Sequence, residues 1–119
     1  MNDKIAYIET AKKKYPLVFN LNVMEEIQEK YGSMANWGDI VENKGGKEPK
    51  IKDLKIGLTE MMNEAIDIEN EDREIKEPFV NPKLVGRIIG EVGFDKITKV
   101  IKDLTIASTK SEDSEGKNE

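Results

Sequence analysis

The chain has 119 residues, a length that suits one domain with a core of its own. It contains no cysteine and no histidine, which excludes disulfides and thiolate metal sites and removes the commonest general base. Its formal net charge of −5 opposes binding to the phosphates of nucleic acid, and no apolar run is long enough for a membrane span.

The first predicted element is a β-hairpin within residues 4–20. The segment Ile5 to Ile8 is apolar between charges, and the segment Tyr15 to Phe19 alternates as one face of a strand does. Pro16 is tolerated only on an edge strand. Because a lone hairpin is marginal in water, we expect it to lie on the helices that follow or to pair with another chain. Whether its edge joins subunits of a homo-oligomer is left open by the sequence.

The segment YPLVFNLNVMEEIQEKYGS leads from this hairpin into an amphipathic helix that ends at Tyr31. Asn20 or Asn22 can cap its start, and Gly32 suits the left-handed residue that often follows a helix. Helical spacing predicts one apolar face, made of Leu21, Met24, Ile27 and Tyr31.

A second, short helix is predicted from the cap residue Ser33 to about Val41, with Trp37, Ile40 and Val41 on its apolar side. Trp37 is the only tryptophan, and we expect it in the core between the first helices, with a partner contact as the alternative. The glycines and the proline of residues 44–50 predict a mobile loop.

The third and longest helix is predicted from Asp53 to about Asn70. Its apolar side chains form a broad stripe along the helix. A stripe of this width either lies under other elements on two sides or leaves apolar surface exposed. Its members are Leu54, Leu58, Met61, Ala65 and Ile68, widened by Met62 and Ile66, and Ile51 is a candidate extension at its start.

The charge run Glu69 to Glu77 was compared with a calcium-binding loop. Asp67, Glu69 and Glu71 have the alternate spacing of such a loop, but Asp72 replaces its glycine and Pro78 replaces its final glutamate. The sequence therefore predicts a solvated loop here, with no metal site.

Two helices are predicted after this loop. Asn81 and Pro82 form a strong helix start, and Gly93 separates the fourth helix from the fifth. Gly86 and Gly90 either permit close approach of a neighbouring helix or are tolerated on the surface. The apolar positions are Leu84, Val85, Ile88, Ile89 and Val92 in the fourth helix, and Phe94, Ile97, Val100, Ile101 and Leu104 in the fifth.

The predicted fold is therefore α+β and mainly α, with the N-terminal hairpin packed on about five helices. We expect one globular domain over residues 1–108, with the hairpin at about 4–20 and the helices at about 21–108. The polar residues 109–119 contain no apolar member and are predicted to form a disordered acidic tail.

No motif for catalysis or for cofactor binding is found. The GGK of residues 45–47 lacks the spacing of a phosphate loop, and no Ser-His or Cys-His pair exists. We therefore expect neither enzymatic activity nor a cofactor. The last two helices resemble a helix-turn-helix in outline. Three lysines of the second one are offset by Asp95 and Asp103, and it has no arginine, which argues against DNA binding. The lysines are Lys96, Lys99 and Lys102.

The order of elements, together with the stretches F-x-L-N…EEIQEKYGS and NEAIDIENED, resembles the tail assembly chaperones of long-tailed bacteriophages and prophages of Gram-positive hosts. The resemblance covers roughly residues 5–108. It implies a non-catalytic cytoplasmic factor, absent from the finished virion, that keeps the apolar tape measure protein soluble. Tail tube subunits then replace it as they polymerise around the tape. Many such families also make a longer form by ribosomal frameshifting.

A client-binding surface of such a protein needs adaptable apolar side chains that can pack on an amphipathic helix. Its candidates here are Leu58, Met61, Met62 and Ile66; the alternative is that all four are core residues. The competing functional class is a small cytoplasmic helical regulator, with or without DNA binding.

Overall fold

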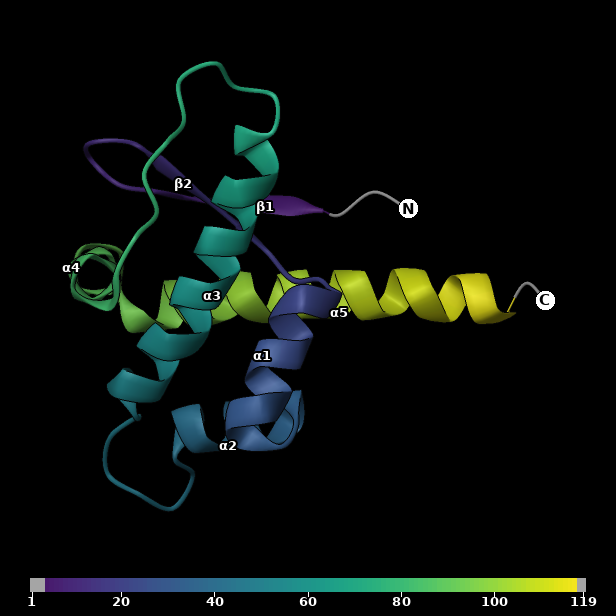
Figure 1. The fold of residues 1–119 in the computed structure, drawn as a ribbon. Coiled ribbons are helices and arrows are strands. Elements are labelled where there is room, and N and C mark those ends of the chain that lie inside the picture. Colours follow the sequence, from purple (N-terminus) through teal and green to yellow (C-terminus); the bar gives the residue numbers. More distant parts are fainter. Residues whose placement is uncertain (1–3, 118–119) are drawn as a thin grey trace.

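The computed structural model describes the backbone of residues 4–117 and the side chains of residues 4–108. It confirms the predicted α+β, mainly α fold: a two-stranded antiparallel hairpin is followed by five helices in the described part of the chain (Figure 1). The elements are β1 (Ile5–Glu9), β2 (Lys14–Val18), α1 (Leu21–Tyr31), α2 (Met34–Glu42), α3 (Ile51–Asn70), α4 (Pro82–Val92) and α5 (Phe94–Lys117).

The hairpin lies between α3 and α5. Strand β2 packs on α3, and β1 contacts α5, which runs crosswise behind α3 in Figure 1. Residues 15–18 of β2 are buried on both faces of the strand, whereas in β1 only Ile8 is buried and Tyr7 and Glu9 are exposed. A hairpin covered on both faces obtains from the helices the stability that it lacks alone.

One hydrophobic core joins both strands to all five helices. Helices α1 and α2 pack against α3, and α4 contacts both α3 and α5. The largest fully buried side chains are Leu17, Ile27, Leu54, Leu58, Met61, Met62 and Ile97, together with Val18, Val23 and Val85.

The predicted helix caps are confirmed. The side-chain oxygens of Asn20, Ser33 and Asn81 each accept a hydrogen bond from the backbone N–H three residues later, at 3.1, 3.0 and 2.8 Å. Gly32 ends α1 with a φ of +87°, a conformation that residues with a side chain rarely adopt. These features depend only on neighbouring residues, and the sequence shows them directly.

The predicted apolar face of α1 is wrong at its first member. Leu21 is 67% exposed, and the buried residues of the helix are Val23 and Ile27. Met24 and Tyr31 pack only partly against the core. Because α1 contacts both α2 and α3, its buried face points between these helices, and Leu21 in the first turn lies outside that contact.

Helix α3 starts at Ile51, the candidate extension of the predicted helix, after Lys50 in an extended conformation without a side-chain cap. The limit of the last helix differs from the prediction. Helix α5 continues to Lys117, past the expected end near residue 108. The side chains from residue 109 onward, and residues 118–119 altogether, lie outside the described residues, so the disorder of this tail stays a prediction.

Close packing on a glycine occurs in α3 and not in α4. A methyl group at Gly90 would meet no atom within 4 Å, and one at Gly86 would meet only the Lys55 side chain at 3.4 Å. At Gly57, in contrast, the buried indole of Trp37 occupies the place that a side chain would take. Trp37 is therefore a core residue, as expected, and its Nε1–H donates to the Asp53 carbonyl at 2.9 Å.

Candidate partner-binding groove

The four side chains predicted to bind a client lie in the core. Leu58, Met61 and Met62 are 0% exposed, and Ile66 is 4% exposed. The α3 stripe is broad because the hairpin covers one side of it and α1 and α2 cover the other. These residues therefore pack in the core, and of the four only Ile66 also lines a surface hollow, the one beside the hairpin described below. A larger exposed surface for a partner lies elsewhere.

The surface between α1 and α3 is hollowed into an open groove of about 450 Å³. Carboxylates dominate it, with three from α3 and two from α1. Its lining residues are Asn22, Val23, Glu25 and Glu26 of α1, Glu60, Asn63, Glu64 and Asp67 of α3, and Phe79 of the following loop.

Glu64 lines this acidic groove and is held in place by two side-chain amides. Its Oε2 accepts hydrogen bonds from the side-chain amides of Asn20 and Asn22, at 2.8 and 2.9 Å. Both donors come from the start of α1, so the capping segment also orients this carboxylate. The amides are neutral, and the negative charge of Glu64 remains available to a partner.

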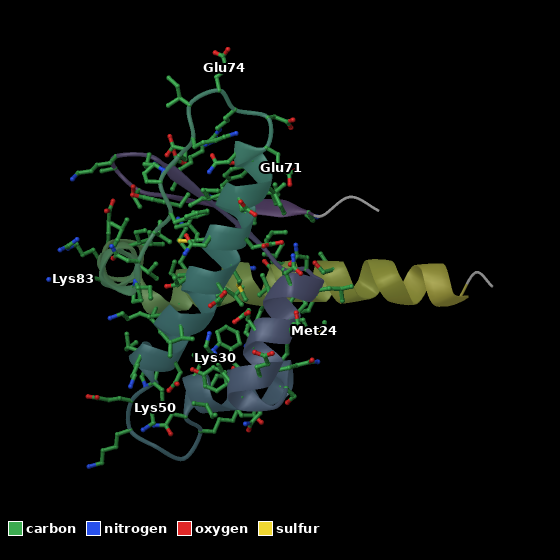
Figure 2. The ribbon with its side chains drawn as sticks, viewed as in Figure 1. Met24, Lys30, Lys50, Glu71, Glu74 and Lys83 are labelled. Carbon is green, nitrogen blue, oxygen red and sulfur yellow. The ribbon has the colours of Figure 1, made fainter. Side chains whose placement is uncertain are left out.

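Lys30 is the one cation paired with groove carboxylates among the described side chains. Its Nζ lies 3.2 Å from Glu60 and 3.6 Å from Glu26, and Figure 2 shows it on α1 beside α3. Partial burial acts to lower the pKa of Lys30, but the hydrogen bond and the charge of Glu60 outweigh it, and the pKa is raised. One lysine against five carboxylates leaves the groove strongly negative.

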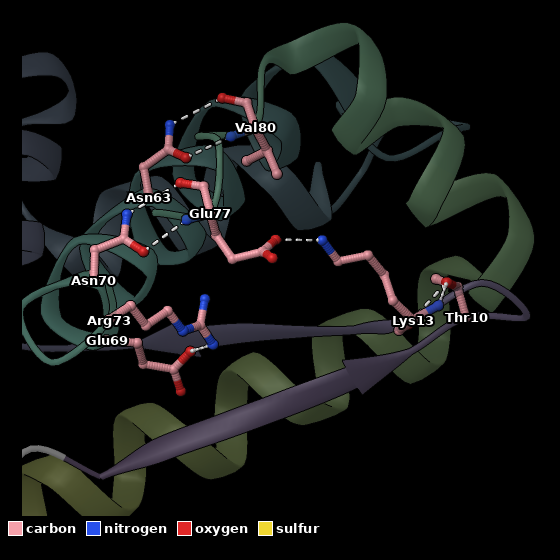
Figure 3. Close-up of polar contacts among 8 residues, drawn as sticks. All are labelled: Thr10, Lys13, Asn63, Glu69, Asn70, Arg73, Glu77 and Val80. Atoms are coloured by element: carbon pink, nitrogen blue, oxygen red, sulfur yellow. Dashed lines mark hydrogen bonds and ion pairs between the residues drawn. The ribbon is translucent and has the colours of Figure 1, made fainter. Parts of the chain in front are cut away.

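Phe79 lines the groove and is 57% exposed. The backbone on either side of it is fixed to α3 by two asparagines (Figure 3). Asn63 exchanges two hydrogen bonds with the backbone of Val80, at 2.8 and 3.0 Å. Asn70 does the same with Glu77, at 2.9 and 3.0 Å.

This pair of asparagines acts as a clamp on residues 77–80. Asn63 and Asn70 are seven residues apart, which places both amides on one side of α3, two turns from each other. Asn70 is itself buried, with 8% of its surface exposed, and an amide at such a position must find partners. The exposed phenyl ring of Phe79 is therefore presented on a backbone of fixed position.

A salt bridge ties the same loop to the hairpin turn. Lys13 Nζ lies 2.7 Å from Glu77 Oε2, and this hydrogen bond lowers the pKa of the Glu77 carboxyl (Figure 3). A second hollow of about 300 Å³ lies where the hairpin, α3 and the loop meet, and Phe79 also lines it. The loop thus connects the groove with the hairpin.

The groove presents charge, hydrogen-bonding groups and one aromatic ring to a binding partner. Its side chains are carboxylates, amides, a valine and a phenylalanine, with no nucleophile beside a base. No cluster of three or more acidic side chains within the described residues is placed to hold a metal ion. A segment that carries both cations and apolar side chains would complement the carboxylates and the ring together.

Comparison with protein families, with characterised proteins and with solved structures yields no match for this chain. In addition, none of the helices over residues 4–117 is long and apolar enough to cross a membrane.

The sequence carried weak signals for this site. Asn63 and Asn70 lie beside the apolar stripe of α3, two helical turns apart. At this spacing both side-chain amides can bind one extended segment. Phe79 is a lone aromatic residue between charges and the strong helix start at Asn81. Neither signal identifies its partner, because the loop returns to α3 only in the tertiary structure.

Proposed function

We propose that this protein is a non-catalytic tail assembly chaperone of a phage or prophage, acting in the cytoplasm of the bacterial host and absent from the mature virion. It binds the tape measure protein and keeps it soluble until tail tube subunits polymerise around the tape. The sequence resemblance motivates this proposal. The observation that supports a binding role is the acidic groove, which is also lined by the exposed ring of Phe79.

The client segment that fits this groove is an amphipathic helix with lysine or arginine beside its apolar stripe. The apolar side chains pack on Phe79, and the cations pair with Glu64 and its neighbours. A groove that is already negative also accelerates the encounter with a positive segment. The high charge of the remaining surface keeps the loaded complex in solution.

Co-expression with the tape measure protein tests the proposal. The wild-type chain should increase the soluble fraction of the tape and should co-purify with it. The double variant Phe79→Ala, Glu64→Lys should lose the complex, because it removes the ring and reverses the charge of the held carboxylate. Ile75→Ala is the matched control: Ile75 is 86% exposed and does not line the groove.

Three outcomes would count against the proposal. If the tape stays insoluble with the wild-type chain, the chaperone role is wrong. If the double variant binds the tape as well as Ile75→Ala does, the groove is not the binding surface. Sequence-selective binding of the purified protein to duplex DNA would favour the competing regulator.

A further inference from the structure

The register of the hairpin fixes which backbone groups of β1 point away from β2. The N–H of Thr10 donates to the Lys13 carbonyl at 2.9 Å, and hydrogen-bonded pairs then recur at every second residue of an antiparallel pair. Ala6 and Ile8 therefore bond to β2. The N–H and C=O groups of Ile5, Tyr7 and Glu9 point to the outer edge.

The outer edge of β2 is closed to further pairing. By the same register, Lys14, Pro16 and Val18 carry its outward groups, and proline has no N–H to donate. Pro16 lies opposite Tyr7, where the absence of its N–H costs the hairpin no bond. A third strand added at this edge would lack its central hydrogen bond.

The outer edge of β1 has no such protection. No described side chain or backbone group bonds to the outward N–H or C=O groups of Ile5, Tyr7 and Glu9. The strand IAYIE contains no proline and no lysine, and Tyr7 at its centre is 50% exposed. Natural proteins usually cover, charge or shorten such an edge, because it is a template for another strand.

We propose that β1 pairs with β1 of a second copy, antiparallel about a twofold axis at Tyr7, to form a four-stranded sheet. Tyr7 then bonds to its own counterpart, and Ile5 of each chain bonds to Glu9 of the other. Each outward group finds one partner of the opposite kind.

Charge and closure favour a second copy as the occupant. The strand is preceded by Lys4 and ends with Glu9, so antiparallel pairing keeps the like charges of the two copies at opposite ends of the contact, whereas in-register parallel pairing would place them side by side. The sheet would end on both sides in β2, where Pro16 prevents further addition. The contact is therefore isologous and stops at the dimer.

Sedimentation of the full chain over a range of concentrations tests this dimer. The wild-type protein should reach a mass near twice 13.5 kDa. Tyr7→Pro should weaken the dimer by at least about tenfold, because it removes the central outward N–H and leaves every hairpin bond intact. Tyr7→Phe is the matched control: it keeps the edge and loses only the hydroxyl, which bonds to Glu69 at 2.7 Å.

Hydrogen exchange of the wild-type protein gives a result that does not depend on a variant folding. The amides of Ile5, Tyr7 and Glu9 should become protected as the protein concentration rises, whereas those of Ala6 and Ile8 should be protected throughout. A monomer at all concentrations, rapid exchange of the three outward amides, or a dimer that survives in folded Tyr7→Pro would each overturn the proposal. Client binding plays no part in these measurements.

Discussion

Trp37 packs on the backbone of α3 because residue 57 has no side chain. A methyl group at this position would overlap the six-membered ring of the indole, which is 96% buried and cannot swing away. Gly57→Ala should therefore lower the free energy of unfolding by about 1–3 kcal/mol, despite the better helix propensity of alanine. Urea unfolding followed by circular dichroism measures the change.

Gly90→Ala is the matched control in a helix of the same protein. A methyl group there would meet no atom within 4 Å, so the substitution should raise the free energy of unfolding by roughly 0.5–1 kcal/mol. If Gly57→Ala stabilises the protein as Gly90→Ala does, the indole of Trp37 does not pack against residue 57.

The buried side chains of Met62 and Ile66 give a second prediction at the scale of single residues. Met62→Ala and Ile66→Ala should each lower the free energy of unfolding by about 2–5 kcal/mol, because each leaves a cavity in a closed core. Phe79→Ala should change it by less than about 1 kcal/mol, since the ring is mostly exposed. Thermal melts of the three variants measure the losses of stability. A larger loss for Phe79→Ala than for the other two would show that Met62 and Ile66 are not core residues.

Tyr31 makes the fold sensitive to alkali. Burial and the hydrogen bond that its hydroxyl donates to Asp53, 2.7 Å long, raise the pKa of Tyr31 to about 12. Because this value lies above the ordinary pKa near 10, the stabilisation is complete below pH 10 and is lost as the pH rises toward 12. Tyr31→Phe should lower stability by about 1 kcal/mol at neutral pH and should flatten the decline above pH 10. Unfolding curves at pH 7 and pH 11 check both effects.

At the scale of elements, the loop between α3 and α4 depends on side chains of α3. Asn70→Ala would leave the backbone N–H and C=O of Glu77 without their partners and should cost about 1–3 kcal/mol. The amide of Glu77 should exchange faster, whereas the amide of Val80 should stay protected by Asn63. Equal acceleration of both amides would show that the two asparagines do not act separately.

The elements themselves could be predicted from the sequence because their signals are local. Asn81 and Pro82 start α4, Gly32 ends α1, and Pro16 indicates an edge strand, each through its own backbone chemistry. The buried side of α1 could not be predicted, since Leu21 and Val23 are equally apolar and only the direction of α3 decides between them. The breadth of the α3 stripe did not decide whether Met61 is buried. Its burial follows from the packing of the hairpin on α3, which is a tertiary contact.

The candidate site was less accessible to prediction for a related reason. Carboxylates on the polar sides of α1 and α3 look like ordinary solvated residues until the two helices are placed side by side. Asn63 and Asn70 have no distinctive neighbours in sequence, and their bonds span seventeen and seven residues. A groove made by two elements and a returning loop is a property of their packing.

At the scale of the whole molecule, the absence of histidine predicts a flat response to pH near neutrality. No side chain with an ordinary pKa changes its charge between pH 6 and 8. Below this range of pH, the protonation of Glu77 and Glu42 affects the stability of the fold. Hydrogen bonds from Lys13 and Lys102 hold the pKa values of these two carboxyls below their ordinary value of 4.5.

Because the folded pKa values of both carboxyls are lowered, their contribution is present above pH 4.5 and is lost as the pH falls through the lowered values. Melting temperatures should therefore be constant from pH 6 to 8 and should decrease below pH 4.5. The double variant Glu42→Gln, Glu77→Gln should show a smaller decrease. A melting temperature that changes between pH 6 and 8 would point to a titrating group outside this account.

The burial of Trp37 against α3 has a practical consequence. Trp37 is the sole tryptophan, so the tryptophan fluorescence of this chain reports on one contact, between α2 and α3. Its emission should shift to the red when that contact opens, without any attached dye. Tyrosine-free excitation near 295 nm would then follow unfolding, or the arrival of a client, in a mixture with any protein that lacks tryptophan.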